Sequence, residues 1–347
     1  MLLSTSSSEA ARRSLAVLLL LLAAIFAAVE VFARFVVDRA SNVEVMVQRE
    51  HQEAVAIRRA GEGDASRQLL VVGNSLVGMD LDFPRLARSL GPDWQAHRYW
   101  LYNTSYDDWY FGLKRLFADG SRPDAVAVTL APLSVYHTGI RGDYSSFYLF
   151  RPADMRAIAA EADLDKTQVS GLLLARYSRF YGLRSEIRKV LLQRILPDLP
   201  RMNELFHRGT GKALSGNEVG AVVAPRLAKL RQLIESNGAQ MVLIFPPMPK
   251  AELEYRDEMV AAAQSAGVPL LMPVSGADVP AATFIDNIHL SPAGAELYTA
   301  TLAPVLQAAL VRSKPSPVMV QASNSNRNDS QAPVVSRPLA LPVQSIP

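Results

Sequence analysis

A serine, a histidine and an aspartate in two short segments of this chain could together cleave or transfer an acyl ester. Ser75 stands in the sequence Gly-Asn-Ser-Leu at 73–76, directly after the apolar run 69–72, whereas Asp286 and His289 share a segment near the other end. In a Ser-His-Asp set the serine attacks, the histidine takes its proton and the carboxylate orients the histidine, whatever their chain order. The three-residue spacing brings Asp286 and His289 to one face of a turn. We therefore expect His289 to act as the base for Ser75.

The surrounding sequence predicts elements that would bring the serine and the histidine together. The run 69–72 is typical of a strand buried on both faces, and the Gly-Asn pair after it favours a tight turn. Ser75 would then lie at the carboxyl end of a strand, where open α/β sheets bind ligands, and a following helical turn would aim backbone N–H groups at a developing oxyanion. Pro292 favours a helix start, so we expect His289 on a loop before the last helix.

The two segments resemble the first and last sequence blocks of the SGNH, or GDSL-type, serine hydrolase superfamily. Asn74 stands where aspartate is commoner in the first block, and at 286–294 the aspartate and the histidine share one segment, as in the family. The G-x-S-x-G elbow of α/β-hydrolases fits less well, because Val77 stands at its second glycine. The resemblance implies an acyl-enzyme mechanism with Ser75 as the nucleophile.

The segment 102–108 is similar to the second block of that family. Asp108 stands where the family has an oxyanion glycine. The resemblance implies that the Ser75 N–H and an N–H of this segment stabilise the oxyanion, with neighbouring side chains in support. The oxyanion and supporting residues implied in this way are Asn74, Asn103, Ser105 and Asp108.

The third block departs from the family pattern. The family places G-x-N-D after a strand, whereas here the strand-like run 125–130 is followed by Ala-Pro-Leu-Ser at 131–134. The asparagine that usually donates to the oxyanion is therefore missing at this position. This departure resembles the membrane-anchored SGNH proteins that accompany the acylation of cell-surface glycopolymers.

The composition excludes several other classes of function. The 347 residues carry 36 basic and 33 acidic side chains, a net charge of +3, which is too balanced for nucleic-acid binding. The absence of cysteine excludes disulfides and thiolate metal sites. The other histidines lack metal-ligand spacing, and the sequence contains no Gly-rich phosphate loop. We therefore expect no metal and no cofactor.

A long apolar segment begins near the N-terminus. Two arginines precede 14–29, which contains no charge, and the segment reaches the roughly 20 residues of a membrane span if Glu30 lies near the far interface. A cleaved signal peptide and a buried core helix are the alternatives. We expect an uncleaved anchor over 14–37 in the inner membrane, with residues 1–13 in the cytoplasm and the catalytic domain in the periplasm or outside the cell.

Strand-like runs alternate with helical patterns through 67–312, which we interpret as the catalytic domain. This alternation predicts a three-layer α/β/α sandwich of the flavodoxin-like type, with a mostly parallel sheet. We interpret the polar segment 38–66 as a stalk, and 313–347, rich in Ser, Pro, Asn and Gln, as a disordered tail. The strand-like runs are 69–72, 98–102, 125–130, 240–245 and 268–272.

Residues 136–221 depart from this alternation and are interpreted as a largely helical insertion. Its basic residues could form an ordinary solvated face, or contact anionic lipid, an acidic polymer or a partner; they include Arg176, Arg179, Arg184, Arg188, Lys189 and Arg194. Its first aromatic residues could line an acceptor groove, although ordinary packing is the simpler interpretation. They are Tyr136, His137, Tyr144, Phe147, Tyr148 and Phe150.

These features together predict a membrane-anchored SGNH-like serine acyl esterase or O-acyltransferase, acting on O-acetyl groups of cell-envelope polysaccharide or exopolysaccharide. The expected partners are an acylated glycan or other acyl ester, and a multi-spanning acyltransferase or polysaccharide export complex. Asp108 and the segment 131–134 leave open a catalytically weak scaffold that binds glycan. The anchor leaves open a lipid esterase, which would prefer long acyl chains.

Overall fold

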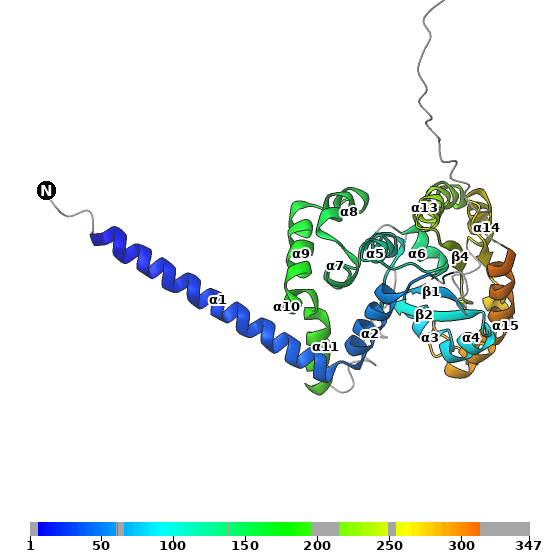
Figure 1. Ribbon diagram of the computed structural model, residues 1–347, viewed down its shortest axis with the longest axis horizontal. Coiled ribbons are helices and arrows are strands. Elements are labelled where there is room, and N and C mark those ends of the chain that lie inside the picture. Colours follow the sequence, from blue (N-terminus) through cyan, green and yellow to red (C-terminus); the bar gives the residue numbers. More distant parts are fainter. Residues whose placement is uncertain are drawn as a thin grey trace, which may run out of the picture. The chain divides into compact units, whose positions relative to one another are not determined.

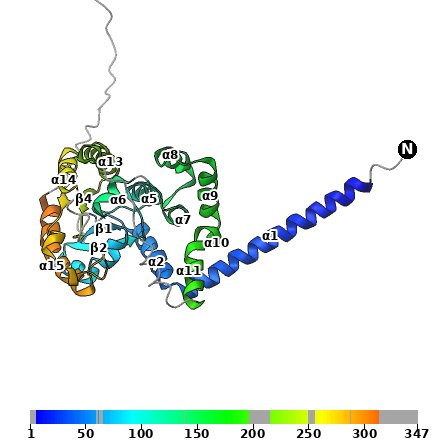
Figure 2. The ribbon, with the colours of Figure 1, turned by 180° about the vertical axis from the view of Figure 1, so that it is seen from behind.

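The structure is a computed structural model that describes residues 6–59, 61, 66–137, 139–195, 215–248, 255–286 and 288–312. This part of the chain contains a parallel sheet, helices on both faces of the sheet and a long N-terminal helix (Figures 1 and 2). The tail expected over 313–347 lies outside the described residues.

Within the described residues the sheet consists of β1 (Arg67–Gly73), β2 (Trp94–Trp100), β3 (Ala125–Thr129), β4 (Gln240–Ile244) and β5 (Leu270–Leu271). All neighbouring strands are parallel, in the order β2-β1-β3-β4-β5, which is the flavodoxin-like doubly wound order. The apolar runs of β1 and β3 are buried on both faces, as parallel strands covered by helices require. The predicted fold class is confirmed.

Two apolar clusters fill the layers on either side of the sheet, because alternate residues of a strand point to opposite faces. Leu69 and Val71 pack with α3 (Ser75–Met79), α4 (Phe83–Ser89) and α15 (Pro292–Arg312). Leu70 and Val72 pack on the other side. The helices there are α2 (Asn42–Ala56), α5 (Tyr106–Ala118), α6 (Pro132–Tyr136), α13 (Gly216–Ser236) and α14 (Arg256–Ser265).

The segment 38–66, interpreted as a stalk, is in large part a piece of the folded domain. The helix α1 (Ser6–Ala40) is followed after one residue by α2, whose first turn is capped by the side chain of Ser41. Val47 and Ala54 of α2 are buried in the same cluster as α5, and α2 packs beside β2. The stalk interpretation was therefore wrong for α2, since burial of its apolar stripe binds it to the core.

The helix α1 is long and apolar enough to cross a membrane over Ala10–Val37, with a mean hydropathy of 2.8 in its most apolar window. No part of that window is buried by the rest of the described chain. A core helix would be buried, whereas a signal sequence passes the same test of length and composition. The N-terminus therefore holds one candidate membrane span among the described residues.

The connection between β3 and β4 contains the predicted helical insertion. Its helices are α7 (Asp143–Leu149), α8 (Met155–Glu161), α9 (Lys166–Tyr177), α10 (Arg179–Gly182) and α11 (Arg184–Ile195). The expected end of the insertion at 221 falls inside α13, which begins at Gly216. That boundary was wrong because Ser215 and Glu218 form a capping box that starts the helix earlier.

Candidate active site

Ser75 is positioned by a sharp turn between β1 and α3. At Gly73 any Cβ would overlap the carbonyl oxygen of Thr129 on β3, so only glycine allows the strands to approach this closely. Asn74 is the N-cap of α3: its Oδ1 accepts a hydrogen bond from the Leu76 N–H at 3.1 Å. Ser75 is consequently the first residue of the helix, where a backbone N–H has no intrahelical acceptor.

Asn74 also links this turn to the loop after β2. Its Nδ2 donates a hydrogen bond to the carbonyl oxygen of Thr104 at 3.3 Å, and the whole residue is buried. Asn74 therefore supports the serine turn through both ends of its amide. An aspartate, which is commoner in the resembling family, could cap the helix but could not donate to Thr104.

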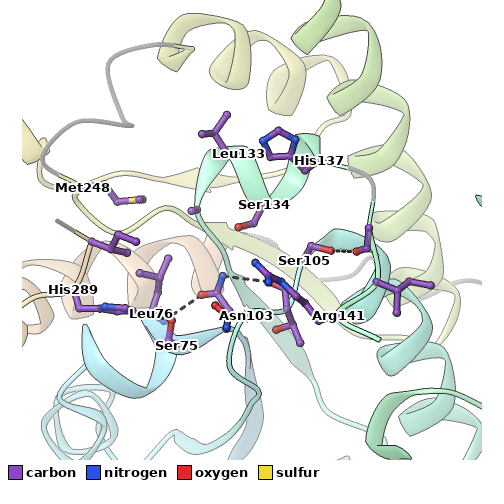
Figure 3. Close-up of a pocket in the computed structure, with 16 residues that line it drawn as sticks. Ser75, Leu76, Asn103, Ser105, Leu133, Ser134, His137, Arg141, Met248 and His289 are labelled. Carbon is purple, nitrogen blue, oxygen red and sulfur yellow. Dashed lines mark hydrogen bonds between the residues drawn. The ribbon is translucent and has the colours of Figure 1, made fainter. Parts of the chain in front are cut away.

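His289 lies between Ser75 and Asp286. Its Nε2 is 2.8 Å from Ser75 Oγ (Figure 3). Its Nδ1 is 2.8 Å from Asp286 Oδ2. Asp286 Oδ1 accepts the backbone N–H groups of Ile288 at 2.7 Å and His289 at 2.6 Å. The carboxylate thereby holds the tautomer with a proton on Nδ1, which leaves Nε2 to accept the Ser75 proton.

The ionised form of Asp286 is favoured although its side chain is partly buried. Desolvation by burial acts to raise the pKa of Asp286, but the hydrogen bonds from the His289 side chain and from two backbone N–H groups outweigh it and lower the pKa below its ordinary value. An anionic carboxylate beside the imidazole can stabilise an imidazolium, the form that His289 would take on accepting the Ser75 proton.

Asp80 holds the histidine loop against the serine helix. This residue is the C-cap of α3, is fully buried and accepts the Leu290 N–H through Oδ1 at 3.0 Å. Burial raises the pKa of the Asp80 carboxyl to about 8. Sequence reasoning missed Asp80, because its partner lies at the far end of the chain. The only local signal was an acidic residue at the end of the helix that begins with Ser75.

A cavity of about 570 Å³ opens beside Ser75 at the carboxyl edge of the sheet. Segments that follow β1, β2, β3 and β4 all contribute to it, as expected for an open parallel sheet (Figure 3). The residues of this pocket that bear on the chemistry are Ser75, His289, Asn103, Ser105, Ser134, His137 and Arg141, with Leu133, Met248 and Ile288 as apolar lining.

Asn103 and Ser105 line this pocket, whereas Asp108 does not. Asn103 has a φ of 59°, a left-handed conformation that asparagine tolerates well. Ser105 is the N-cap of α5, and its hydroxyl donates to the carbonyl oxygen of Gly139 at 2.5 Å. Of the four residues implied as oxyanion or supporting groups, Asn74, Asn103 and Ser105 therefore lie at the pocket.

Asp108 serves the helix terminus behind the pocket. Its Oδ2 accepts the Ser105 N–H at 2.8 Å, and its Oδ1 accepts the Arg141 N–H at 3.3 Å. The side chain is fully buried, and this burial raises the pKa of Asp108 to about 6. The position expected for an oxyanion glycine thus holds a capping carboxyl that ties the loop at Arg141 to α5, which no periodicity in the sequence indicates.

The segment after β3 supplies pocket residues that the sequence did not single out. Ser134 on α6 directs its hydroxyl toward the pocket, and Arg141 reaches it from the loop before α7 (Figure 3). The sequence feature that could have identified Ser134 and Arg141 is their position after a strand of the predicted parallel sheet. Of the six aromatic residues considered for an acceptor groove, His137 lines the pocket, whereas Tyr148 and Phe150 are buried in the core. Among the described residues, no group of His, Asp and Glu could hold a metal.

No family model and no curated protein matches the sequence. Among solved structures, the chain is similar to a candidate acylhydrolase from Bacteroides fragilis, with 11% identity, a TM-score of 0.38, and coverage of 76% of this chain and 97% of that one. It is similar to a GDSL-like lipase from Bacteroides thetaiotaomicron, with 10% identity, a TM-score of 0.36, and coverage of 76% of this chain and 98% of that one. It is also similar to an acetyl xylan esterase from Butyrivibrio proteoclasticus, with 12% identity, a TM-score of 0.37, and coverage of 72% of this chain and 65% of that one. Because these structures have low identity to this chain and TM-scores below 0.5, the chemistry assigned to the pocket rests on its own side chains.

Proposed function

We propose that this chain is a membrane-anchored serine ester hydrolase or O-acyltransferase of the SGNH type. Its substrates are O-acyl groups, above all O-acetyl, of cell-envelope polysaccharide or exopolysaccharide. The observation that carries the proposal is the continuous set of hydrogen bonds from Asp286 through His289 to Ser75 at an open pocket. In this proposal α1 anchors the protein in the inner membrane, and the pocket works in the periplasm or outside the cell.

The reaction begins when Ser75 Oγ attacks the carbonyl carbon of the ester while His289 Nε2 takes the serine proton. The Ser75 N–H and the side-chain amide of Asn103 donate hydrogen bonds to the oxyanion of the tetrahedral intermediate. His289 then returns the proton to the departing alcohol oxygen, which breaks the ester bond and leaves an acyl group on Ser75. Water or a sugar hydroxyl, deprotonated by His289, attacks this acyl-enzyme and regenerates the serine.

The lining of the pocket supports a short acyl group on a polar alcohol. Ser134 and Arg141 supply a hydroxyl and a guanidinium, which are suited to sugar hydroxyls and ring oxygens. Leu133 and Met248 supply a small apolar surface for an acetyl group. The proposed partner is a multi-spanning acyltransferase or polysaccharide export complex that delivers the acyl group or the polymer to this pocket.

A fluorophosphonate probe tests the nucleophile directly in the detergent-solubilised full chain. We expect labelling of the wild type and loss of labelling in Ser75→Ala and His289→Ala. Ser134→Ala is the matched control, because it removes a second serine of the pocket that makes no hydrogen bond with His289. An unlabelled wild-type protein that is folded by circular dichroism would contradict the proposal and favour the scaffold alternative.

A second assay distinguishes water from a sugar as the acyl acceptor and short acyl chains from long ones. The protein is supplied with acetyl, butyryl and octanoyl p-nitrophenyl esters, with and without a hydroxylated oligosaccharide, and the free acid and acylated sugar are quantified. A preference for acetyl with transfer to the sugar supports an O-acyltransferase, and acetate release alone supports an esterase. A preference for octanoyl would contradict a polysaccharide substrate and favour a lipid esterase.

A further inference from the structure

The last three turns of α1 are attached to the helical insertion and to the core of the domain. Glu30 of α1 accepts the backbone N–H groups of Arg179 at 2.9 Å and Phe180 at 3.3 Å, together with the hydroxyl of Ser178. Ala33 and Val37, which follow on the same face of α1, are buried in the apolar cluster of the domain. The end of the apolar helix and α10 therefore form one packed unit.

The position of Glu30 along α1 fixes the depth of this contact in a bilayer. At 1.5 Å per residue, Glu30 lies about 26 Å along the helix axis from Arg13, whereas the hydrocarbon core of a bilayer is about 30 Å thick. With Arg13 at one surface, Glu30 lies close to the opposite surface. A carboxylate at that depth is costly unless it has hydrogen-bond partners. The partners are on Ser178, Arg179 and Phe180, so this segment lies at the same depth.

Exposed apolar side chains lie on α9, α10 and α11, helices that pack one on the next and adjoin this contact. Tyr177 is 72% exposed, Phe180 37% and Ile195 72%. Leu174 lies one turn before Tyr177, and Leu191 one turn before Ile195, so each pair shares a helix face. Large apolar side chains gathered in this way mark an interaction surface. The lipid face, as we define it, consists of Leu174, Tyr177, Phe180, Leu191 and Ile195.

Positive charge borders the lipid face. Arg188 and Lys189 are exposed on α11, and Lys189 Nζ lies 5.6 Å from the centre of the Tyr102 ring. Aromatic residues with basic neighbours are typical of segments that lie at the interface between lipid and water. Basic side chains there are attracted to anionic headgroups.

We propose that the lipid face lies in the interfacial layer of the bilayer that α1 spans, on the far side from Arg13, with Arg188 and Lys189 at anionic lipid headgroups. The contact with Glu30 sets its depth, its apolar side chains enter the headgroup region, and α1 and the insertion together hold the domain on the surface. Because Tyr102 directly precedes Asn103, the α11 contact also brings the pocket loop near the membrane.

The absence of cysteine in the chain allows a direct test. The full-length protein is prepared as single-cysteine variants Tyr177→Cys and Phe180→Cys, labelled with a nitroxide and inserted into nanodiscs of phosphatidylethanolamine and phosphatidylglycerol. Collisions of the nitroxide with oxygen, which concentrates in lipid, are compared with collisions with a water-soluble nickel complex. Leu20→Cys on α1 is the lipid reference. Leu297→Cys, an apolar residue of α15 that is 69% exposed, is the matched control away from the lipid face.

We expect oxygen accessibility to exceed nickel accessibility at positions 20, 177 and 180, with the reverse at 297. All four side chains are exposed, so the substitutions remove no core packing. Nickel accessibility as high at 177 and 180 as at 297 would overturn the proposal while leaving the span at Leu20 intact. Shielding of 177 and 180 from both reagents would also overturn it, because it would indicate a protein partner. None of these readouts depends on catalytic activity.

Discussion

Asp80 accepts a hydrogen bond at 3.0 Å from the backbone N–H of Leu290, the residue after His289. Asp80 ends the short helix that Ser75 begins, so one buried carboxyl connects the segments that carry Ser75 and His289. The distance of 2.8 Å between Ser75 Oγ and His289 Nε2 therefore depends on a residue that is outside the Ser-His-Asp set.

Removal of the Asp80 carboxyl should loosen the histidine loop. Asp80→Ala leaves the Leu290 N–H without its acceptor, which we expect to cost about 1–3 kcal/mol in the free energy of unfolding. It should also lower kcat more than it raises KM, since the base moves relative to Ser75. Asp80→Asn keeps an acceptor oxygen and is the matched control. Urea titrations and ester turnover check both effects, and an equal kcat in the two variants would contradict the positioning role.

The same carboxyl should make stability depend on pH. Burial raises the pKa of folded Asp80 from an ordinary value of 3.8 to about 8, so the folded state holds this proton more tightly than the unfolded chain. The free energy of unfolding therefore falls as the pH rises from about 4 to about 8. Asp80→Asn cannot ionise and should reduce this fall. Buried Glu44, whose pKa burial raises to about 7, contributes in the same direction. Identical pH slopes in wild type and Asp80→Asn would contradict the expectation.

Replacement of Asp286 by asparagine should abolish most activity without unfolding the protein. The asparagine keeps an oxygen for the backbone N–H groups of Ile288 and His289, but its amide favours the wrong imidazole tautomer. We expect kcat to fall by roughly 10⁴-fold, with little change in the melting temperature. Single-turnover acylation by a p-nitrophenyl ester measures the effect. A loss below about tenfold would mean that the carboxylate does not orient His289.

The role of Asn74 should require both the oxygen and the nitrogen of its side-chain amide. Asn74→Asp retains the acceptor for the Leu76 N–H but places a carboxylate oxygen against the carbonyl of Thr104. We expect a loss of about 1–3 kcal/mol in the free energy of unfolding and a fall in kcat. Asn74→Ser, which retains only the cap, is the control. Greater stability of Asn74→Asp than of wild type would refute the link to Thr104.

The apolar runs predicted the sheet, because strands buried on both faces are continuous runs of apolar residues. The two end motifs predicted the approach of Ser75, His289 and Asp286. The charged residues of α2 favoured a solvated stalk, but in the structure Glu44 is buried against Tyr144 and Glu50 pairs with Arg98 at 2.5 Å. The roles of Asp80 and Asp108 could not be predicted from the sequence either. The roles of buried carboxyls depend on partners that are distant in the chain.

The single residue between α1 and α2 has a consequence for how this enzyme would meet its substrate. Ser41 leaves no length of flexible chain between the two helices, so with α1 anchored as proposed the pocket would travel with α1. Encounters with the proposed polymer would then depend on lateral diffusion in two dimensions and on the section of polymer that passes at one fixed height above the lipid. Such a protein would modify a chain as it emerges from the membrane, and polymer already released into solution would largely escape it.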